Sequence, residues 1–138
     1  MKHLFILVVA LFSSTISFAQ SDKEQITETL LHYIEGTADG SPERIKKAFH
    51  KDLNLYSIAN DTLSITSGKK YIGYFKEGEK RNRIGKIISI DVVNNAAMAK
   101  VEIDFPKGKR LYTDYMMLLK VKGEWKIIHK SYTFVPYK

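Results

Sequence analysis

The sequence predicts one α+β domain in which three helices from the N-terminal half pack on a strongly curved antiparallel sheet. Apolar residues recur at helical spacing after an N-terminal leader, and they alternate along the chain from about residue 86 onward. The later strands are joined by short turns, which suit antiparallel neighbours. Helices early and strands late are typical of α+β domains. Such helices on one side of a curved sheet would form a cone with an open mouth, a common place for a ligand pocket.

Residues 1–19 have the features of a cleaved signal peptide. Lys2 precedes the apolar run Leu4–Phe12, and the small residues Ser17 and Ala19 stand three and one positions before the expected cut. The run is shorter than the roughly 20 residues that a membrane-spanning helix needs, which argues against an uncleaved anchor. We therefore expect a periplasmic or secreted protein, cleaved after Ala19, with no integral membrane segment in its mature form.

Cleavage would leave residues 20–138 as a single domain, large enough to bury a core of its own. The chain has no cysteine, so packing must stabilise it without disulfides. Its net charge is +7, and loss of Lys2 with the leader reduces this to +6. The lysines are spread along the chain, so we interpret the charge as solvated surface and expect no nucleic-acid partner.

The helices are indicated by their N-terminal signals and apolar stripes. Ser21 and Glu24 form a capping box before the first helix, and Ser41 with Pro42 begins the second. A third helix should follow Ser67, with aromatic residues on one face. The expected ranges are 22–35, a short helix from 42, and about 68–80.

The strands are separated by turn residues. Asn60-Asp61, Asn94-Asn95 and Lys122-Gly123 each suit a tight hairpin, and the last can take the positive φ that such a turn requires. The predicted strands are Leu53–Ile58, Thr62–Thr66, Lys86–Val93, Ala96–Phe105, Leu111–Val121 and Glu124–Phe134.

The final hairpin supplies the best candidate for a functional site. If Lys122 and Gly123 form a two-residue turn, Asp114 and His129 share one face of the hairpin. They could act there as an acid/base pair in an apolar pocket. Alternatively, each is a satisfied polar residue with a structural role. A slip of one residue in the register would separate them.

The opposite face of the hairpin is also largely apolar, so we expect another sheet or a second subunit to cover it. The predicted dimer interface contains Tyr115, Met117, Ile128 and Lys130. Aromatic and polar residues elsewhere could form stacking walls for a flat ring, or could simply pack in the core. The predicted ligand-binding residues are Tyr33, His50, Tyr56, Tyr71, Phe75, Tyr112, Asp114, Trp125 and His129. Of these, His50 could instead cap its helix, and Trp125 could anchor the core.

Several chemical motifs do not occur in the sequence. It contains no glycine-rich phosphate loop, no HExxH and no G-x-S-x-G, and one of its four histidines is in the leader. We therefore expect no metal and no cofactor.

The chain resembles the nuclear transport factor 2-like (NTF2-like) cone fold and, within it, exported bacterial proteins of the putative lumazine-binding family. The resemblance runs over nearly all of Asp22–Phe134 and rests on residue types and spacings. The matching segments are Tyr33-Ile34-Glu35-Gly36 with Asp39, Phe49-His50, Tyr112–Tyr115 with Leu118–Lys120, and Gly123–Lys130. It implies a cone-shaped domain and a homodimer packed sheet against sheet. Members of this superfamily include isomerases, dehydratases and proteins that only bind ligands.

Three functions follow as hypotheses. The first is an exported protein that binds a small apolar or heterocyclic ligand in an aromatic-lined cone, without catalysis. The second is an isomerase- or dehydratase-like enzyme that uses Asp114 and His129. The third is a dimeric interaction module whose cone is filled by its own side chains. We favour the first over an enzyme.

Overall fold

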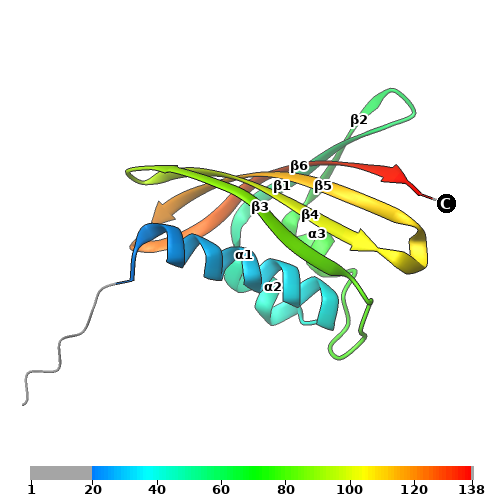
Figure 1. Cartoon of the computed structure of the whole chain (residues 1–138), viewed down its shortest axis with the longest axis horizontal. Coiled ribbons are helices and arrows are strands. Elements are labelled where there is room, and N and C mark those ends of the chain that lie inside the picture. Colours follow the sequence, from blue (N-terminus) through cyan, green and yellow to red (C-terminus); the bar gives the residue numbers. More distant parts are fainter. Residues whose placement is uncertain (1–19, 138) are drawn as a thin grey trace, which may run out of the picture.

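The computed structural model describes residues 20–137, so the predicted signal peptide lies outside the described residues. The described residues form three helices and one six-stranded sheet, and residues 106–108 form a 3-10 turn, η1. The helices lie beneath the sheet (Figure 1). The helices are α1 (Asp22–Asp39), α2 (Pro42–Ala48) and α3 (Gly68–Ile72). The strands are β1 (Phe49–Ala59), β2 (Thr62–Ser67), β3 (Ile84–Val93), β4 (Ala96–Phe105), β5 (Arg110–Val121) and β6 (Glu124–Pro136).

The strands lie in the order β2-β1-β6-β5-β4-β3. Neighbouring strands are antiparallel except for β1 and β6, which run parallel. Short turns join strands β3, β4, β5 and β6 into a meander. Strand β1 pairs with β6, the last strand of this meander, although β2 to β5 lie between them in the sequence. The tip of the β1–β2 hairpin projects beyond the rest of the sheet (Figure 1).

Helix α1 begins as predicted and ends later. The capping box is formed: Ser21 accepts a hydrogen bond from the Glu24 amide, and the Glu24 side chain accepts one from the Ser21 amide. The helix continues through the expected stop and ends where Gly40 takes a left-handed conformation, at φ 65°. Burial of Gly36 within the helix gives the added turn a packing role.

Helix α3 is much shorter than predicted. It ends at Ile72, and the irregular segment that follows contains Gly73 and, at φ 78°, Gly78. Glycine disfavours a helix interior, so the aromatic stripe at residues 71–75 belongs to one turn of helix and the loop after it.

The core lies between the helices and the inner face of the sheet. Gly85 allows α1 to approach β3 closely, because a Cβ atom at this position would stand 2.3 Å from Ile34 Cγ2. The largest fully buried side chains are those of Tyr33, Ile26, Leu30, Ile45, Leu53, Leu55, Ile103, Met116, Leu118, Ile127, Val101 and Thr37.

A β-bulge in β6 changes the register of the final hairpin. Lys122 and Gly123 form the predicted turn with positive φ, and Leu118 lies opposite Ile127 as expected. The next paired residues are Met117 and His129, so Ile128 is the extra residue. Beyond this point every residue of β6 faces the side opposite to the one predicted.

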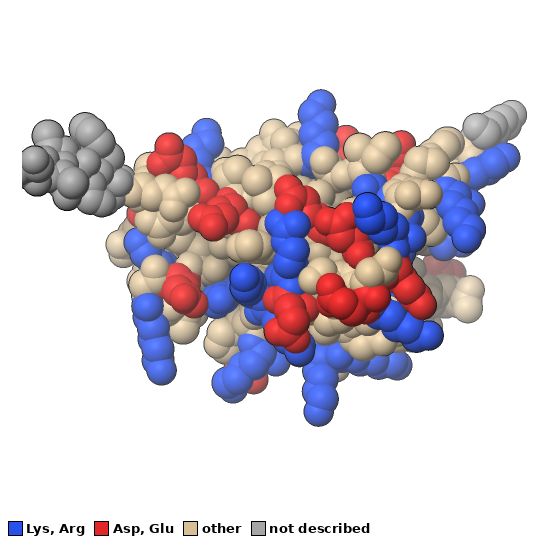
Figure 2. Space-filling model, turned by 90° about the horizontal axis from the view of Figure 1, so that it is seen from below, with Lys and Arg blue, Asp and Glu red and all other residues tan. Residues whose placement is uncertain are grey.

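The surface carries both charges. On the side of the molecule that bears the helices, basic and acidic side chains are interspersed (Figure 2). The helices within residues 20–137 are all too short or too polar to cross a membrane.

Candidate functional site

A cavity of about 210 Å³ lies between the helices and the inner face of the sheet. It contains one acidic and two basic side chains among aromatic and aliphatic walls. The lining residues are Tyr33, Leu55, Thr66, Tyr71, Tyr74, Arg83, Ile103, Tyr112, Asp114, Lys130 and Tyr132. Helix α1 supplies Tyr33, the loop before β3 supplies Arg83, and β5 and β6 supply Asp114 and Lys130.

Asp114, Lys130 and Tyr33 form a buried polar cluster in the wall of the cavity. Lys130 Nζ lies 3.0 Å from Asp114 Oδ2, and the two side chains are 5% and 1% exposed. The Tyr33 hydroxyl donates to the same oxygen at 2.7 Å and accepts a hydrogen bond from Lys130. Asp114 Oδ1 has no hydrogen-bond partner among the described residues. This oxygen can therefore accept a hydrogen bond from a ligand.

Aromatic rings surround the ammonium group of Lys130. Its Nζ lies 4.6 Å from the ring centroid of Tyr33, 5.1 Å from that of Tyr132 and 5.3 Å from that of Tyr71. Cation–π attraction therefore adds to the ion pair. Burial, followed by the negative charge of Asp114, raises the pKa of Tyr33 well above its usual value, so its hydroxyl stays protonated at neutral pH.

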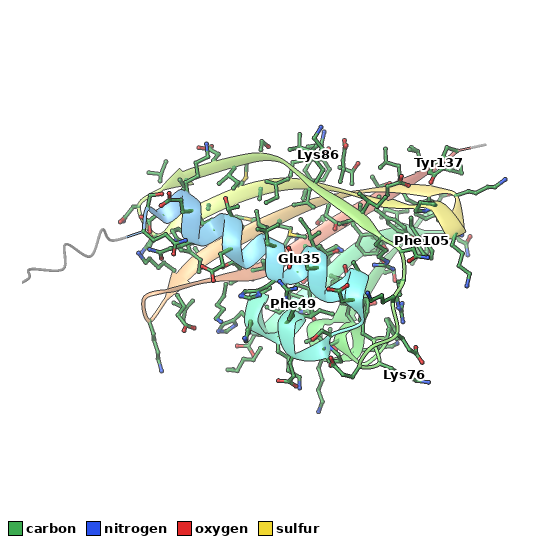
Figure 3. All side chains as sticks on the ribbon, turned by 60° about the horizontal axis from the view of Figure 1, so that its bottom comes forward. Glu35, Phe49, Lys76, Lys86, Phe105 and Tyr137 are labelled. Carbon is green, nitrogen blue, oxygen red and sulfur yellow. The ribbon has the colours of Figure 1, made fainter. Side chains whose placement is uncertain are left out.

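Arg83 is held by aromatic residues. Its guanidinium lies 5.3 Å from the ring centroid of Phe105 and 5.7 Å from that of Phe75. Phe105 lies at the end of the sheet away from the start of α1 (Figure 3). Burial lowers the pKa of Arg83, but the surrounding tyrosines, Tyr71 foremost, outweigh this effect, and the net shift is upward. Arg83 is therefore a cation held at the cavity wall.

The cavity brings together four of the nine predicted ligand-binding residues, namely Tyr33, Tyr71, Tyr112 and Asp114. Phe75 lies just behind them, with its ring centroid 5.2 Å from that of Tyr71. Trp125 belongs to the core, where its indole N–H donates to Asp22 at 3.0 Å. Aromatic residues at helical and strand spacing were thus a partly correct signal for the cavity.

His129 does not share a face with Asp114, and the predicted acid/base pairing is wrong. The bulge at Ile128 turns His129 to the outer face of the sheet, where its ring stacks on Tyr56 with a centroid distance of 4.7 Å. Its Nε2 lies 2.7 Å from Ser131 Oγ. Both His129 and Tyr56 therefore lie on the side of the sheet opposite the cavity.

His50 also lies away from the cavity. It belongs to β1, which begins at Phe49 directly after α2 (Figure 3), and it lines a separate groove with Lys46 and Lys69. Its Nδ1 accepts a hydrogen bond from the Asp52 amide at 3.3 Å. It thus contacts its own strand and does not cap α2 through this nitrogen.

Larger hollows lie elsewhere among residues 20–137. They measure about 680 Å³ around Tyr56, 670 Å³ beside the start of α1, 500 Å³ around His50 and 380 Å³ around Tyr115. None of these four is lined by a buried charged side chain among the described residues. The smaller cavity is therefore the better candidate, because a buried charge next to a cavity is typical of functional sites.

The structure places only some of the predicted dimer-interface residues on the outer face of the sheet. Tyr115 and Met117 are 53% and 47% exposed on the outer face, whereas Ile128 is half-buried at the bulge. Lys130 was assigned to this face, and that assignment is wrong: the same bulge turns it inward to Asp114.

Four further cationic or aromatic side chains line the cavity and were not predicted to do so, namely Arg83, Lys130, Tyr74 and Tyr132. Arg83 lies between the predicted third helix and the strand predicted from Lys86, in a segment for which no element and no role was expected. The unbroken register placed Lys130 on the outer face, and Tyr132, two residues further along the strand, shares the face of Lys130. Within residues 20–137, no group of three or more His, Cys, Asp or Glu side chains could hold a metal ion.

Comparison with known proteins agrees with this architecture. A family model described as putative lumazine-binding matches residues 21–133. An NTF2-like protein of unknown function from Methylobacillus flagellatus KT has 27% identity and a TM-score of 0.73, covering 87% of this chain and 97% of its own. One from Shewanella baltica OS155 has 26% identity and a TM-score of 0.73, covering 83% and 94%. These similarities confirm the expected NTF2-like α+β fold.

A relative with an assigned activity is more distant. The aldolase FrzH from Cladobotryum sp. is 22% identical over 117 residues, which cover 84% of this chain and 94% of that protein.

Proposed function

We propose that this chain, which belongs to the putative lumazine-binding family, binds a small heterocyclic ligand in the cavity between α1 and the sheet. The observation that carries the proposal is a buried carboxylate oxygen, Asp114 Oδ1, left without a partner in an aromatic-walled cavity. A ring N–H of the ligand would satisfy this oxygen, while tyrosine rings would pack against the faces of the heterocycle.

The volume of the cavity favours a small ligand. Pockets for drug-sized molecules measure ~300–1,000 Å³, whereas this cavity measures about 210 Å³. A ligand of one or two fused rings suits this space.

Calorimetric titration with lumazine tests the proposal. Tyr71, half-buried at the cavity, should stack on the ring, so Tyr71→Ala should weaken binding roughly 5- to 150-fold, the range that corresponds to ~1–3 kcal/mol for stacking of one base. Tyr115→Ala, an aromatic truncation on the outer face, is the matched control and should bind like the original protein. Equal losses in the two variants, or no binding of any bicyclic heterocycle, would refute the proposal.

Proton transfer next to a carbonyl group is a second candidate function. It is favoured by the free Asp114 oxygen beside the ammonium group of Lys130, and it suits a distant relative, 22% identical, that is named as an aldolase. In this reaction Asp114 would take a proton from the carbon next to the carbonyl, and Lys130 would stabilise the enolate oxygen that forms.

Exchange of α-protons of cyclohexanone for deuterium, followed by NMR, tests this second candidate. The double variant Asp114→Asn/Lys130→Met removes both groups without leaving a buried charge alone. With this variant, the α-protons of cyclohexanone should exchange at the uncatalysed rate. With the original protein, they should exchange faster. Exchange that persists in the folded double variant would exclude these two residues as the catalytic groups.

We further infer that the chain is exported and acts as a homodimer. Export is supported by the leader, Lys2 followed by Leu4–Phe12 and the small residues up to Ala19. Dimerisation through the outer sheet face is supported by its exposed apolar side chains, among them Tyr115 and Met117. An intact mass equal to that of residues 20–138 would verify cleavage after Ala19. Uncleaved protein in the periplasm would contradict it.

A further inference from the structure

Arg83 is a cavity cation for which the fold supplies no carboxylate. Among residues 20–137 no salt bridge joins it to Asp or Glu, and its buried Nε has no hydrogen-bond partner. Lys130, by contrast, is paired with Asp114 at 3.0 Å. The charged groups of the lining are therefore one internal ion pair and one further guanidinium.

The position of Arg83 is set by packing. The rings of Phe75 and Phe105 contact its guanidinium, and Tyr71 lines the cavity beside it. Aromatic rings hold the plane of a guanidinium without neutralising its charge. A half-buried cation of this kind favours a ligand that brings the missing negative charge, because a buried charge is costly unless it is paired.

We propose that the ligand is a planar ring carrying one oxyanion, either a carboxylate or an ionised ring oxygen, and that Arg83 binds this group. The inference rests on the proposed function, since it requires the ligand to occupy the cavity. The fork of N–H donors on arginine matches a carboxylate or a pair of ring oxygens better than an ammonium group does.

The arrangement also assigns the orientation of the ligand. Arg83 receives the oxyanion, and Asp114 Oδ1 accepts from a ring N–H elsewhere on the ligand. Lys130 remains paired with Asp114 Oδ2 at 3.0 Å. The proposed ligand class is therefore a flat ring that carries an N–H donor for Asp114 and an oxyanion for Arg83.

Calorimetry with matched probes tests the proposal on the mature protein. Indole-5-carboxylate, which carries a ring N–H for Asp114, should bind about 10-fold or more tightly than indole-5-carboxamide, because the amide lacks the charge. Arg83→Met should abolish this preference, whereas Arg83→Lys should retain part of it. Lumazine, titrated below and above the pH at which its ring ionises, tests an ionised ring oxygen as the alternative source of the oxyanion.

Arg81→Met is the control. Arg81 also packs on Phe75, at 4.3 Å from the ring centroid, but it does not line the cavity and it donates to the Tyr74 carbonyl. This variant should keep the full preference for the anion. Thermal unfolding of each variant establishes that it is folded.

The outcomes separate this inference from the proposed function. An anion preference that depends on Arg83 but not on Arg81 supports both. If neutral and anionic probes bind equally in both probe series, and Tyr71→Ala weakens them all, the ligand site stands and the anion inference is overturned. If no probe binds the folded protein, both are overturned.

Discussion

Lys130 is a buried cation whose charge is stabilised by the residues around it. Its side chain is 5% exposed, and its charge is balanced by Asp114 and surrounded by tyrosine rings. Long cationic side chains are rarely buried so fully unless they are paired. The stability of the protein should therefore depend on keeping both members of the pair or removing both.

Asp114→Asn should destabilise the protein by about 3–5 kcal/mol, because it leaves the Lys130 ammonium buried without a counter-charge. Adding Lys130→Met should recover much of this loss, since Met has a similar length and no charge. Urea denaturation of the three proteins measures the difference. A double variant less stable than Asp114→Asn would contradict this account of the pair.

Asp114 and Lys130 differ in how far the sequence predicts their position. Asp114 was identified as a cavity residue from its place among apolar neighbours on the final hairpin. Lys130 was not, because one extra residue at Ile128 reverses the faces of the strand beyond it. Two β-branched residues in succession give no local sign of a bulge, and the bulge became visible only in the pairing with β5.

At the scale of elements, the first turn of α1 is tied to the sheet. Asp22 Oδ1 accepts hydrogen bonds from Lys120 Nζ at 2.8 Å and from Trp125 Nε1 at 3.0 Å. These two bonds, that of Lys120 foremost, lower the pKa of Asp22 below its usual 3.8. The unfolded chain therefore takes up this proton first as the pH falls, and the contribution of Asp22 is lost from about pH 4 downward.

Asp22→Asn should accordingly lower the melting temperature at pH 7 and flatten its decline between pH 5 and pH 3. Melting curves followed by circular dichroism at several pH values measure this slope. Lys120→Met removes the main partner instead of the acid and should flatten the decline as well. An unchanged slope in both variants would show that this contact is irrelevant to acid stability.

Gly85→Ala should separate α1 from β3. The new methyl group would overlap Ile34, so we expect a loss of about 1–3 kcal/mol, the range seen for overpacked cores. Gly73→Ala is the control, because its nearest neighbour would be 3.3 Å away and the loss should be much smaller. Equal unfolding free energies for the two variants in urea would argue against a close contact at Gly85.

Elements with strong local signals were predictable. The capping box, the Lys122-Gly123 turn and the range of β4 all follow from residue chemistry that acts within a few positions. The length of α3 did not follow, because its aromatic stripe continues past Gly73 while the helix stops at Ile72. The parallel pairing of β1 with β6 also lay beyond local reasoning, since no turn joins these strands.

At the scale of the whole molecule, the outer sheet face is the proposed dimer interface. Met98 is 57% exposed and pairs with Met117 in the neighbouring strand, so apolar side chains adjoin there. Tyr115→Glu or Met117→Glu should give monomers in sedimentation velocity. Leu31→Glu, which changes an exposed apolar residue on α1, should sediment like the original protein. A sedimentation coefficient that stays unchanged in Tyr115→Glu and Met117→Glu would exclude this face as the dimer interface.

The parallel β1–β6 pair has a consequence for how the chain reaches its native state. Strands β3 to β6 can form as a local meander, but Tyr33 and Asp114 are 81 positions apart, and Tyr33 and Lys130 are 97 apart. Contacts of such high order form late and slow the search for the native topology. The cavity is thus among the last parts of the protein to form, and a nascent chain that lacks β6 contains Asp114 without the lysine that is paired with it.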